Sequence, residues 1–432
     1  MAAMIIPENP YASYGEPIVE SSGDANESGP ELFRRILNDW APALFATHPR
    51  PIVIKEINKV LKCKKTGDGV MYSCPQCDKV RWVPFTCGSL FCPSCGNLYN
   101  QQRANSIGEH MINVPHRHII FTIPASLRPY FLEDRSLLNC LFDSAHETYN
   151  KVITRKWNGN LNTGMIIVLH TFSRSSDWNP HVHCICTEGG FTDWGKWYHR
   201  PFIDFEDLRN TMMDTLLKKL RHRINDSSFA EVEADIRATY KESGFFVYAE
   251  KPPEKFAGNP KKLVKYVSRY LGRPCIATSR IDNYDGKTVK FHYMAHTKDG
   301  EKYTCEELPA LDFLMRLVQH IQDPNFKKVR FYGVYASHGV GADALQKALK
   351  KPTLNPQFSI HYLYDPQAHH IRLQYCHFRG AMFYAFNFDP LVCPCCQKQM
   401  EVEFYAYKGK IFTHPPTKRH SPPVQIEEEE TA

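Results

Sequence analysis

The sequence lacks any apolar run approaching the roughly 20 residues that a transmembrane helix needs. Its first 30 residues contain no lysine or arginine, so they do not resemble a secretory signal peptide, which begins with a basic stretch. No stretch of the chain repeats another. These absences argue against a membrane protein and against a secreted one, and we expect a soluble intracellular protein.

Disordered ends are expected on both sides of the folded part. Residues 1–30 are rich in Pro, Ser, Gly and Glu, and residues 408–432 are Pro-rich and charged. The 432-residue chain is 43% hydrophobic, which is enough for two or three packed domains. We expect domains over residues 31–111 and 112–345, followed by an extension over residues 346–407.

Basic residues dominate the body of the chain more than the net charge of +7 suggests. Residues 1–30 hold five acidic residues and residues 427–430 are four glutamates, so residues 31–426 contain 53 basic and 37 acidic residues. Such a surplus suits a polyanion, because lysine and arginine bind phosphates and release counterions. A soluble protein with a basic, solvated surface explains the charge equally well. Charge alone therefore does not establish nucleic-acid binding.

Six of the 15 cysteines crowd between Cys63 and Cys95. In a reducing compartment, two CxxC pairs at this spacing indicate a metal site more often than disulfides. A CxxC turn directs two thiolates toward one tetrahedral ion, and four thiolates leave no open position for catalysis. We therefore expect one structural Zn2+ site with four ligands. These ligands are Cys74, Cys77, Cys92 and Cys95.

Two cysteines of this block and two near the C-terminus remain outside the expected site. Three roles are open for Cys63 and Cys87: they replace a ligand of the expected site, form half of a second site, or are small core residues. Cys393 and Cys396 form a third CxxC pair, and whether this pair binds a second Zn2+ ion is an open question at this point.

Apolar periodicity divides the rest of the chain into helices and strands. β-Branched and apolar runs predict strands at residues 118–124, 165–172, 180–186 and 328–336, and a hairpin at 285–303. Helical spacing predicts helices within 31–61 and 98–111, and at 135–157, 204–223, 228–242, 260–272 and 308–321. This mixture of elements predicts an α+β protein.

The segment His181-Val-His183 begins one of these strands. Alternate residues of a strand share a face, so both imidazoles project to the same side. Such a pair can bind a divalent metal and leave positions open for substrate oxygens, although a lone His-x-His is more often an ordinary surface or core feature. A histidine-triad hydrolase would need a third alternating histidine, and Ile185 stands in that place.

A third ligand is expected from a neighbouring strand. His170 lies near the end of the preceding strand, and hairpin pairing would bring it close to the histidine pair. His118 lies on the other candidate core strand. We prefer His170, and either histidine also fits the role of a hydrogen-bonded core residue.

Tyr266 and Tyr270 lie four residues apart on the predicted helix 260–272, which places both hydroxyls on one face. Aromatic pairs at this spacing usually pack in a core, but five Lys or Arg residues within thirteen argue against a buried stripe here. A phenol surrounded by cations ionises more easily, and its phenolate can attack phosphorus. The basic residues that flank this pair or extend its face include Lys262, Lys265, Arg269 and Arg273.

These motifs, in this order, resemble the rolling-circle transposases of the HUH superfamily, named for its His-hydrophobic-His pair. The resemblance is to the two-tyrosine type of insertion sequence ninety-one, and it extends over about residues 60–340. It rests on the cysteine block that ends at Cys95, on Pro180-His-Val-His183, on Tyr266-x3-Tyr270 and on the later segment that ends at Ser337.

The resemblance implies an HUH-type antiparallel sheet flanked by helices, preceded by a small helical and zinc-ribbon domain. It implies that His181, His183 and a third histidine bind Mg2+ or Mn2+, and that Tyr266 or Tyr270 attacks single-stranded DNA. It also implies that the DNA strand is bound by Lys262, Lys265, Arg269 and Arg273. The attack would leave a 5′-phosphotyrosine and a free 3′-hydroxyl, and the strand would be transferred from the transposon ends to a target. Such an enzyme would act in the bacterial cytoplasm.

Other functions remain open. A plasmid replication initiator or a conjugative relaxase uses the same chemistry. A non-catalytic zinc DNA-binding regulator would use the histidines and the tyrosines only structurally. A zinc hydrolase of small molecules lacks a supporting nucleophile or carboxylate constellation.

Overall fold

The computed structural model describes residues 29–112, 114–155, 157–250, 274–297, 300–350, 382 and 389–413. This part of the chain forms two units. The first unit consists of the described residues within Met1–Leu61 and Gly88–Phe388. The second consists of those within Lys62–Cys87 and Asp389–Ala432. None of the described helices is long and apolar enough to span a membrane.

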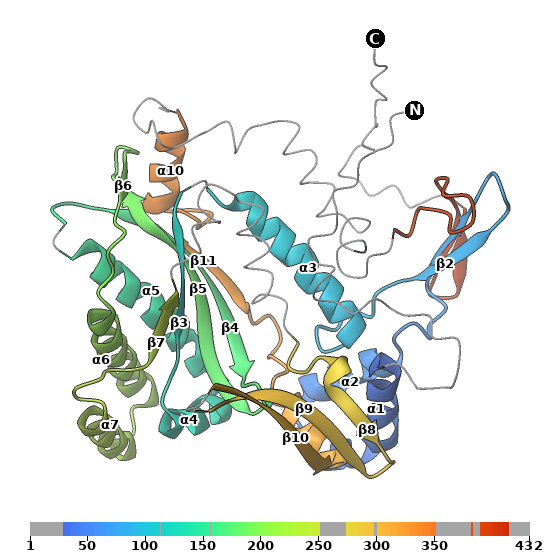
Figure 1. Cartoon of the computed structure of the whole chain (residues 1–432), viewed down its shortest axis with the longest axis horizontal. Coiled ribbons are helices and arrows are strands. Elements are labelled where there is room, and N and C mark those ends of the chain that lie inside the picture. Colours follow the sequence, from blue (N-terminus) through green and yellow to red (C-terminus); the bar gives the residue numbers. More distant parts are fainter. Residues whose placement is uncertain are drawn as a thin grey trace. The chain divides into compact units, whose positions relative to one another are not determined.

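The first unit is built around an antiparallel sheet with the strand order β11-β4-β5-β3-β7, and β6 pairs with β5 beside it (Figure 1). The long hairpin of β4 and β5 forms its centre. The strands are β3 (His116–Phe121), β4 (Asn162–Phe172), β5 (Trp178–Phe191), β6 (Trp197–His199), β7 (Val247–Glu250) and β11 (Val329–Gly333).

Helices cover both faces of this sheet (Figure 1). Alternate side chains such as Ile167 and Val182 pack against α5, α6 and α7 in the main core, whereas Val168 and Ile185 pack on the opposite face against α3. The strands are buried on both faces, which explains their nearly continuous apolar sequence. The helices are α3 (Pro93–His110), α5 (Leu138–Thr154), α6 (Phe205–Ile224) and α7 (Ser227–Thr239); α4 (Arg128–Glu133) follows β3, and α10 (Val340–Lys350) follows β11.

A second sheet in the same unit has the antiparallel order β10-β9-β8. It packs with α1 and α9, and α2 packs in turn against α1. Trp40 Nε1 donates to the Tyr284 hydroxyl at 3.0 Å and so joins α1 to β8. These elements are α1 (Gly29–Ala46), α2 (Pro51–Leu61), β8 (Ile281–Tyr284), β9 (Thr288–Thr297), β10 (Gly300–Pro309) and α9 (Ala310–Val318).

The second unit is a four-stranded antiparallel sheet, β13-β12-β1-β2, made from two distant parts of the chain. Its small core contains Tyr72, Val83 and Met400 together with two buried cysteines. The strands are β1 (Gly69–Ser73), β2 (Val80–Pro84), β12 (Glu401–Tyr407) and β13 (Lys410–Phe412).

The mixed α+β class and most of the expected elements are confirmed within the described residues. The four predicted strands correspond to β3, β4, β5 and β11, and the predicted hairpin to β9 and β10. The predicted helix 260–272 lies outside the described residues. Strand β13 lies within residues 408–432, where the composition predicts a disordered tail; pairing with β12 supplies the hydrogen bonds that order it.

Candidate functional site

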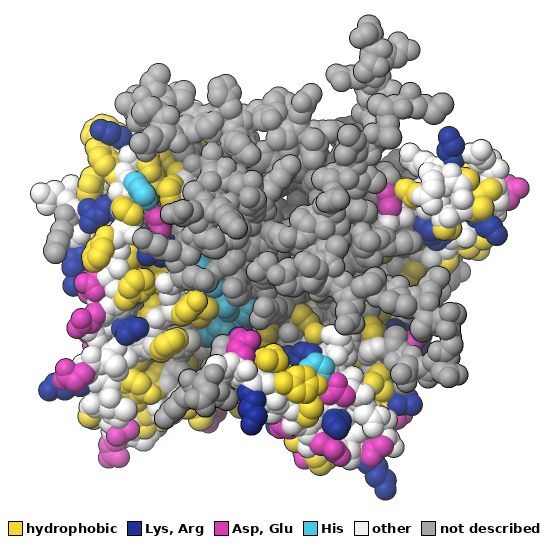
Figure 2. Space-filling view, viewed as in Figure 1, with side chains coloured by type: hydrophobic (Ala, Val, Ile, Leu, Met, Phe, Trp, Pro, Cys, Tyr) yellow, Lys and Arg dark blue, Asp and Glu magenta, His cyan; other side chains and the backbone are white. Residues whose placement is uncertain are grey.

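Three histidines meet on the α3 side of the central sheet, at the turn end of the β4–β5 hairpin. His170 of β4 lies directly opposite His181 of β5, and His183 lies two residues farther along β5. One ligand atom from each lies within 4.8 Å of the others. Their ring centroids are 4.5 to 5.5 Å apart. Histidine side chains gather over this part of the sheet in Figure 2. The structure thus brings together the pair and the third histidine that the sequence favours.

The tautomer of His181 is fixed by the backbone. Its Nδ1 lies 2.7 Å from the Asn179 carbonyl oxygen. A carbonyl only accepts hydrogen bonds, so Nδ1 carries the proton and Nε2 keeps its lone pair. Burial lowers the pKa of His181, although the Asn179 carbonyl opposes the shift, and the nearby Arg128 lowers the pKa further. A neutral imidazole with a free Nε2 is the form that binds a metal ion.

His118, the other candidate from the sequence, takes a different place. It lies on β3, and its Nε2 atom is 3.0 Å from His183 Nδ1. The three-histidine group described above does not include it. Burial lowers the pKa of His118 to about 4, so the ring is neutral at physiological pH. His118 therefore contacts the Nδ1 atom of His183 but is not a member of the three-histidine group.

The two expected nucleophiles, Tyr266 and Tyr270, lie outside the described residues. The same holds for the four basic residues expected beside them, Lys262, Lys265, Arg269 and Arg273. The structure describes the chain up to Glu250 and again from Pro274. Glu250, the last residue of β7, pairs with His118. On the other side, the Cys275 carbonyl accepts a 2.7 Å hydrogen bond from Ser176 Oγ. Ser176 lies in the turn between β4 and β5, so both flanks are attached near the histidine cluster.

The cysteines form two groups, and the expected grouping is corrected. The two CxxC pairs of the front block do not meet each other. Each of them meets two of the four cysteines that the expected site left out. The groups are Cys63, Cys87, Cys92 and Cys95, and Cys74, Cys77, Cys393 and Cys396. The 14 residues between the front pairs include β2, which leads the chain away from the first pair before the second begins.

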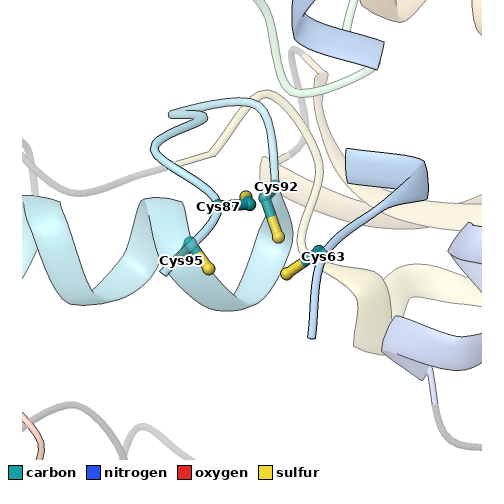
Figure 3. A group of neighbouring side chains, drawn as sticks. All are labelled: Cys63, Cys87, Cys92 and Cys95. Atoms are coloured by element: carbon teal, nitrogen blue, oxygen red, sulfur yellow. The ribbon is translucent and has the colours of Figure 1, made fainter. Parts of the chain in front are cut away.

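The first group lies around the start of α3 (Figure 3). Cys92 is the N-cap of this helix and Cys95 is in its first turn, with Pro93 at the first helical position. Cys63 follows the end of α2, and Cys87 precedes the turn into α3. The amide groups at a helix N-terminus stabilise negative charge, which favours thiolates there. Four thiolates within 4.8 Å of one another suit a closed zinc site.

The second group lies in the four-stranded sheet. Cys74 and Cys77 form a turn between β1 and β2, while Cys393 and Cys396 precede β12. The Cys393 pKa is lowered to about 6, chiefly because the amide of Cys396 donates to its sulfur. Because this group draws its ligands from two distant segments, no spacing rule within the front block predicts it.

Comparison with known proteins gives two family matches. A family described as a transposase zinc-binding domain matches residues 32–123, and one described as “Putative transposase” matches residues 164–341. The first match contains all of Cys63, Cys87, Cys92 and Cys95, and the second contains the three clustered histidines. No solved structure matches the chain.

Two curated relatives support the same relationship. The chain is 31% identical over 378 residues to the transposase for insertion sequence element IS801 of Pseudomonas savastanoi pv. phaseolicola. This alignment covers 84% of the chain and 86% of the relative. The chain is also 25% identical over 281 residues to the putative transposase y4qJ of Sinorhizobium fredii, which covers 61% of the chain and 69% of that protein.

Proposed function

The chain belongs to the IS91 family of transposases, and from this membership we propose that it nicks single-stranded DNA with a tyrosine and transfers the strand. The product of the nick is a 5′-phosphotyrosine and a free 3′-hydroxyl. The element then moves by rolling-circle transposition. This reaction requires a metal site, a nucleophile and a DNA-binding surface, and the chain offers residues for each.

The observation that carries the proposal is the cluster of His170, His181 and His183 on one face of an antiparallel sheet. We propose that these three bind Mg2+ or Mn2+, and that the sheet is of the HUH type. The tautomer of His181 leaves its Nε2 atom available to bind such an ion. Imidazole nitrogens suit Mn2+ better than Mg2+, because Mg2+ prefers oxygen ligands. When bound, the ion polarises the phosphoryl oxygens and stabilises the charge of the transition state.

Arg128 supplies a cation at this cluster. The backbone carbonyl of Arg128 accepts a 3.0 Å hydrogen bond from Nε1 of Trp178, the first residue of β5. The side-chain Nε of Arg128 is buried and has no hydrogen-bond partner among the described residues. Its charge already lowers the pKa of His181. We propose that Arg128 donates to an oxygen of the scissile phosphate.

The nucleophiles are proposed to be Tyr266 and Tyr270. Tyr270 is four residues before Pro274, so the chain between them spans at most about 14 Å. The next residue, Cys275, is hydrogen-bonded to the turn of the β4–β5 hairpin. This attachment supports a position for Tyr270 near the histidines. Its phenolate oxygen bonds to phosphorus as the bond from phosphorus to the 3′ oxygen breaks, and Lys262, Lys265, Arg269 and Arg273 bind the strand.

The phosphodiester energy stays in the tyrosine link, so rejoining needs no ATP. Two tyrosines allow one to hold the donor end while the other cuts a second site. The proposed division of labour assigns residues 31–111 to zinc binding and DNA recognition, residues 112–345 to catalysis and residues 346–407 to an extension with a CxxC pair.

The test uses the full chain and labelled single-stranded ends of the element. With Mn2+, the protein should form an adduct that survives denaturation and disappears on proteolysis. The adduct should be absent when the metal is chelated and should return when Mn2+ is restored. Binding of the ends without any adduct would instead support a non-catalytic DNA-binding regulator.

A further inference from the structure

The turns that carry Cys74–Cys77 and Cys393–Cys396 have the same backbone structure. In each, the amide of the first cysteine donates at 2.8 Å to the carbonyl of the lysine five residues later. In each, the residue after the second cysteine has a positive φ, 52° at Asp78 and 58° at Gln397. These two knuckles of the same geometry meet in the second unit, where their four sulfur atoms lie within 4.8 Å of one another.

The sulfur positions distinguish a metal site from disulfides. Cys74 Sγ lies 3.4 Å from Cys396 Sγ, and Cys77 Sγ lies 3.4 Å from Cys393 Sγ. A disulfide bond is about 2.0 Å long. Four sulfurs at about 2.3 Å from a tetrahedral Zn2+ are separated by about 3.8 Å, and the sulfurs of Cys77 and Cys396 are 3.7 Å apart. The spacing is close to that of four zinc ligands.

Other contacts also join the two segments around this group. The Arg81 guanidinium of β2 donates to the Val392 carbonyl at 2.8 Å, next to the C-terminal knuckle. The Lys408 amide donates to Asp68 Oδ1 at 2.7 Å. Strand β1 pairs with both β2 and β12. The N-terminal hairpin is thus completed by a hairpin from more than 300 residues later.

We propose that Cys74, Cys77, Cys393 and Cys396 bind a second Zn2+ ion, which holds the two segments together as one ribbon. An isolated two-stranded hairpin is at best marginally stable. The small core of this sheet, with few large apolar side chains, calls for a further cross-link such as a metal ion. The matched zinc-binding family ends at residue 123, and so contains only half of this site. The N-terminal part alone therefore supplies only two of the four proposed ligands.

The first test measures zinc in the purified full chain. The wild type should contain two Zn2+ ions, and Cys393→Ser with Cys396→Ser should contain one. Cys395→Ser is the matched control, because Cys395 lies in the same knuckle but is exposed and outside the group. It should keep two ions. A wild type with one ion, or a double variant that keeps two, would overturn the proposal.

The second test needs no variant and therefore does not depend on folding of a mutant. The folded wild type is treated with an alkylating reagent, and each cysteine is followed by mass spectrometry. Cys395 should react at once, while Cys74, Cys77, Cys393 and Cys396 should become reactive together when the zinc is removed by a chelator. If Cys393 and Cys396 react as fast as Cys395 while Cys74 stays protected, the shared site does not exist. Neither test depends on DNA cleavage, so both stand if the proposed function fails.

Discussion

His118 Nε2 lies 3.0 Å from His183 Nδ1, and the two rings are stacked with their centroids 5.2 Å apart. When His183 donates from Nδ1, its Nε2 is left with the lone pair that a metal ion needs. His118 can accept this bond because burial lowers its pKa to about 4 and keeps the ring neutral. This geometry makes His118 a positioning residue for a proposed ligand, comparable to the outer partners of metal-bound histidines.

Replacement of His118 should therefore weaken metal binding without removing a ligand. We expect His118→Leu to lower the affinity for Mn2+ by about 10- to 100-fold. His118→Gln, whose side-chain oxygen can accept the same hydrogen bond, should recover part of the loss. Titration of the folded protein with Mn2+, followed by electron paramagnetic resonance, measures both. Equal affinity of the Leu variant and the wild type would show that His118 has only a packing role.

The histidine pair itself should be needed for cleavage but not for DNA binding. His181→Ala with His183→Ala removes two of the three proposed ligands, so Mn2+-dependent nicking of a single-stranded end should fall by at least about 100-fold. Binding of the same DNA should change little, because the basic residues expected to hold the strand are elsewhere. Nicking assays and binding titrations on one preparation separate the two effects. Undiminished cleavage would refute the metal assignment.

Local periodicity predicts four strands of the central sheet, β3, β4, β5 and β11, and with them the histidine cluster, but it does not predict the short strands β6 and β7. The β4–β5 hairpin is specified by two apolar strands and a polar turn, and pairing across it brings His170 opposite His181. This arrangement depends on residues close in sequence. The placement of His118 depends on which strand pairs with the other edge of β5, and a single strand pattern does not specify its neighbour.

The cysteine grouping could not be predicted from spacing, because spacing identifies a knuckle but not its partner. Cys74 and Cys393 belong to one group although about 320 residues separate them. A signal was nevertheless present. Both knuckles read Cys-Pro-x-Cys-x-Lys, whereas Cys92-Pro-Ser-Cys95 continues as Gly-Asn into a helix. The shared Lys position accompanies the shared turn hydrogen bond and marks the matching pair.

A buried carboxylate in the helical layer gives a prediction about stability. Glu233 of α7 is 1% exposed and is bound by Arg221 and Arg237. Burial raises its pKa, but the hydrogen bonds and charges of the two arginines outweigh this and lower the pKa overall. Glu233→Gln should reduce the free energy of unfolding by about 1–2 kcal/mol at pH 7. The expected loss is no larger because Arg221 is largely exposed, and solvent screens its attraction to the carboxylate.

The sign of the pH dependence follows from the lowered pKa. The stabilisation by Glu233 is present above the ordinary glutamate pKa of about 4.3 and is lost as the pH falls through the lower folded-state pKa. The difference between wild type and Glu233→Gln should therefore shrink under acid conditions in urea unfolding curves. Glu231→Gln, on the exposed side of the same helix, is the control and should differ little from wild type. A constant difference down to pH 3 would contradict this account.

The nucleophile assignment distinguishes the proposed enzyme from a DNA-binding regulator most directly. Tyr266→Phe with Tyr270→Phe should abolish the covalent adduct with a 3′-labelled single-stranded end, because phenylalanine keeps the ring and removes only the hydroxyl that bonds to phosphorus. Each single variant should still form the adduct at one end, but should fail to complete strand transfer, since the second cut lacks its nucleophile. Tyr332→Phe is a matched control: this tyrosine of β11 donates to Asp143 on the side of the sheet away from the histidines. It should leave adduct formation unchanged. An adduct with the double variant would mean that another residue attacks the phosphate.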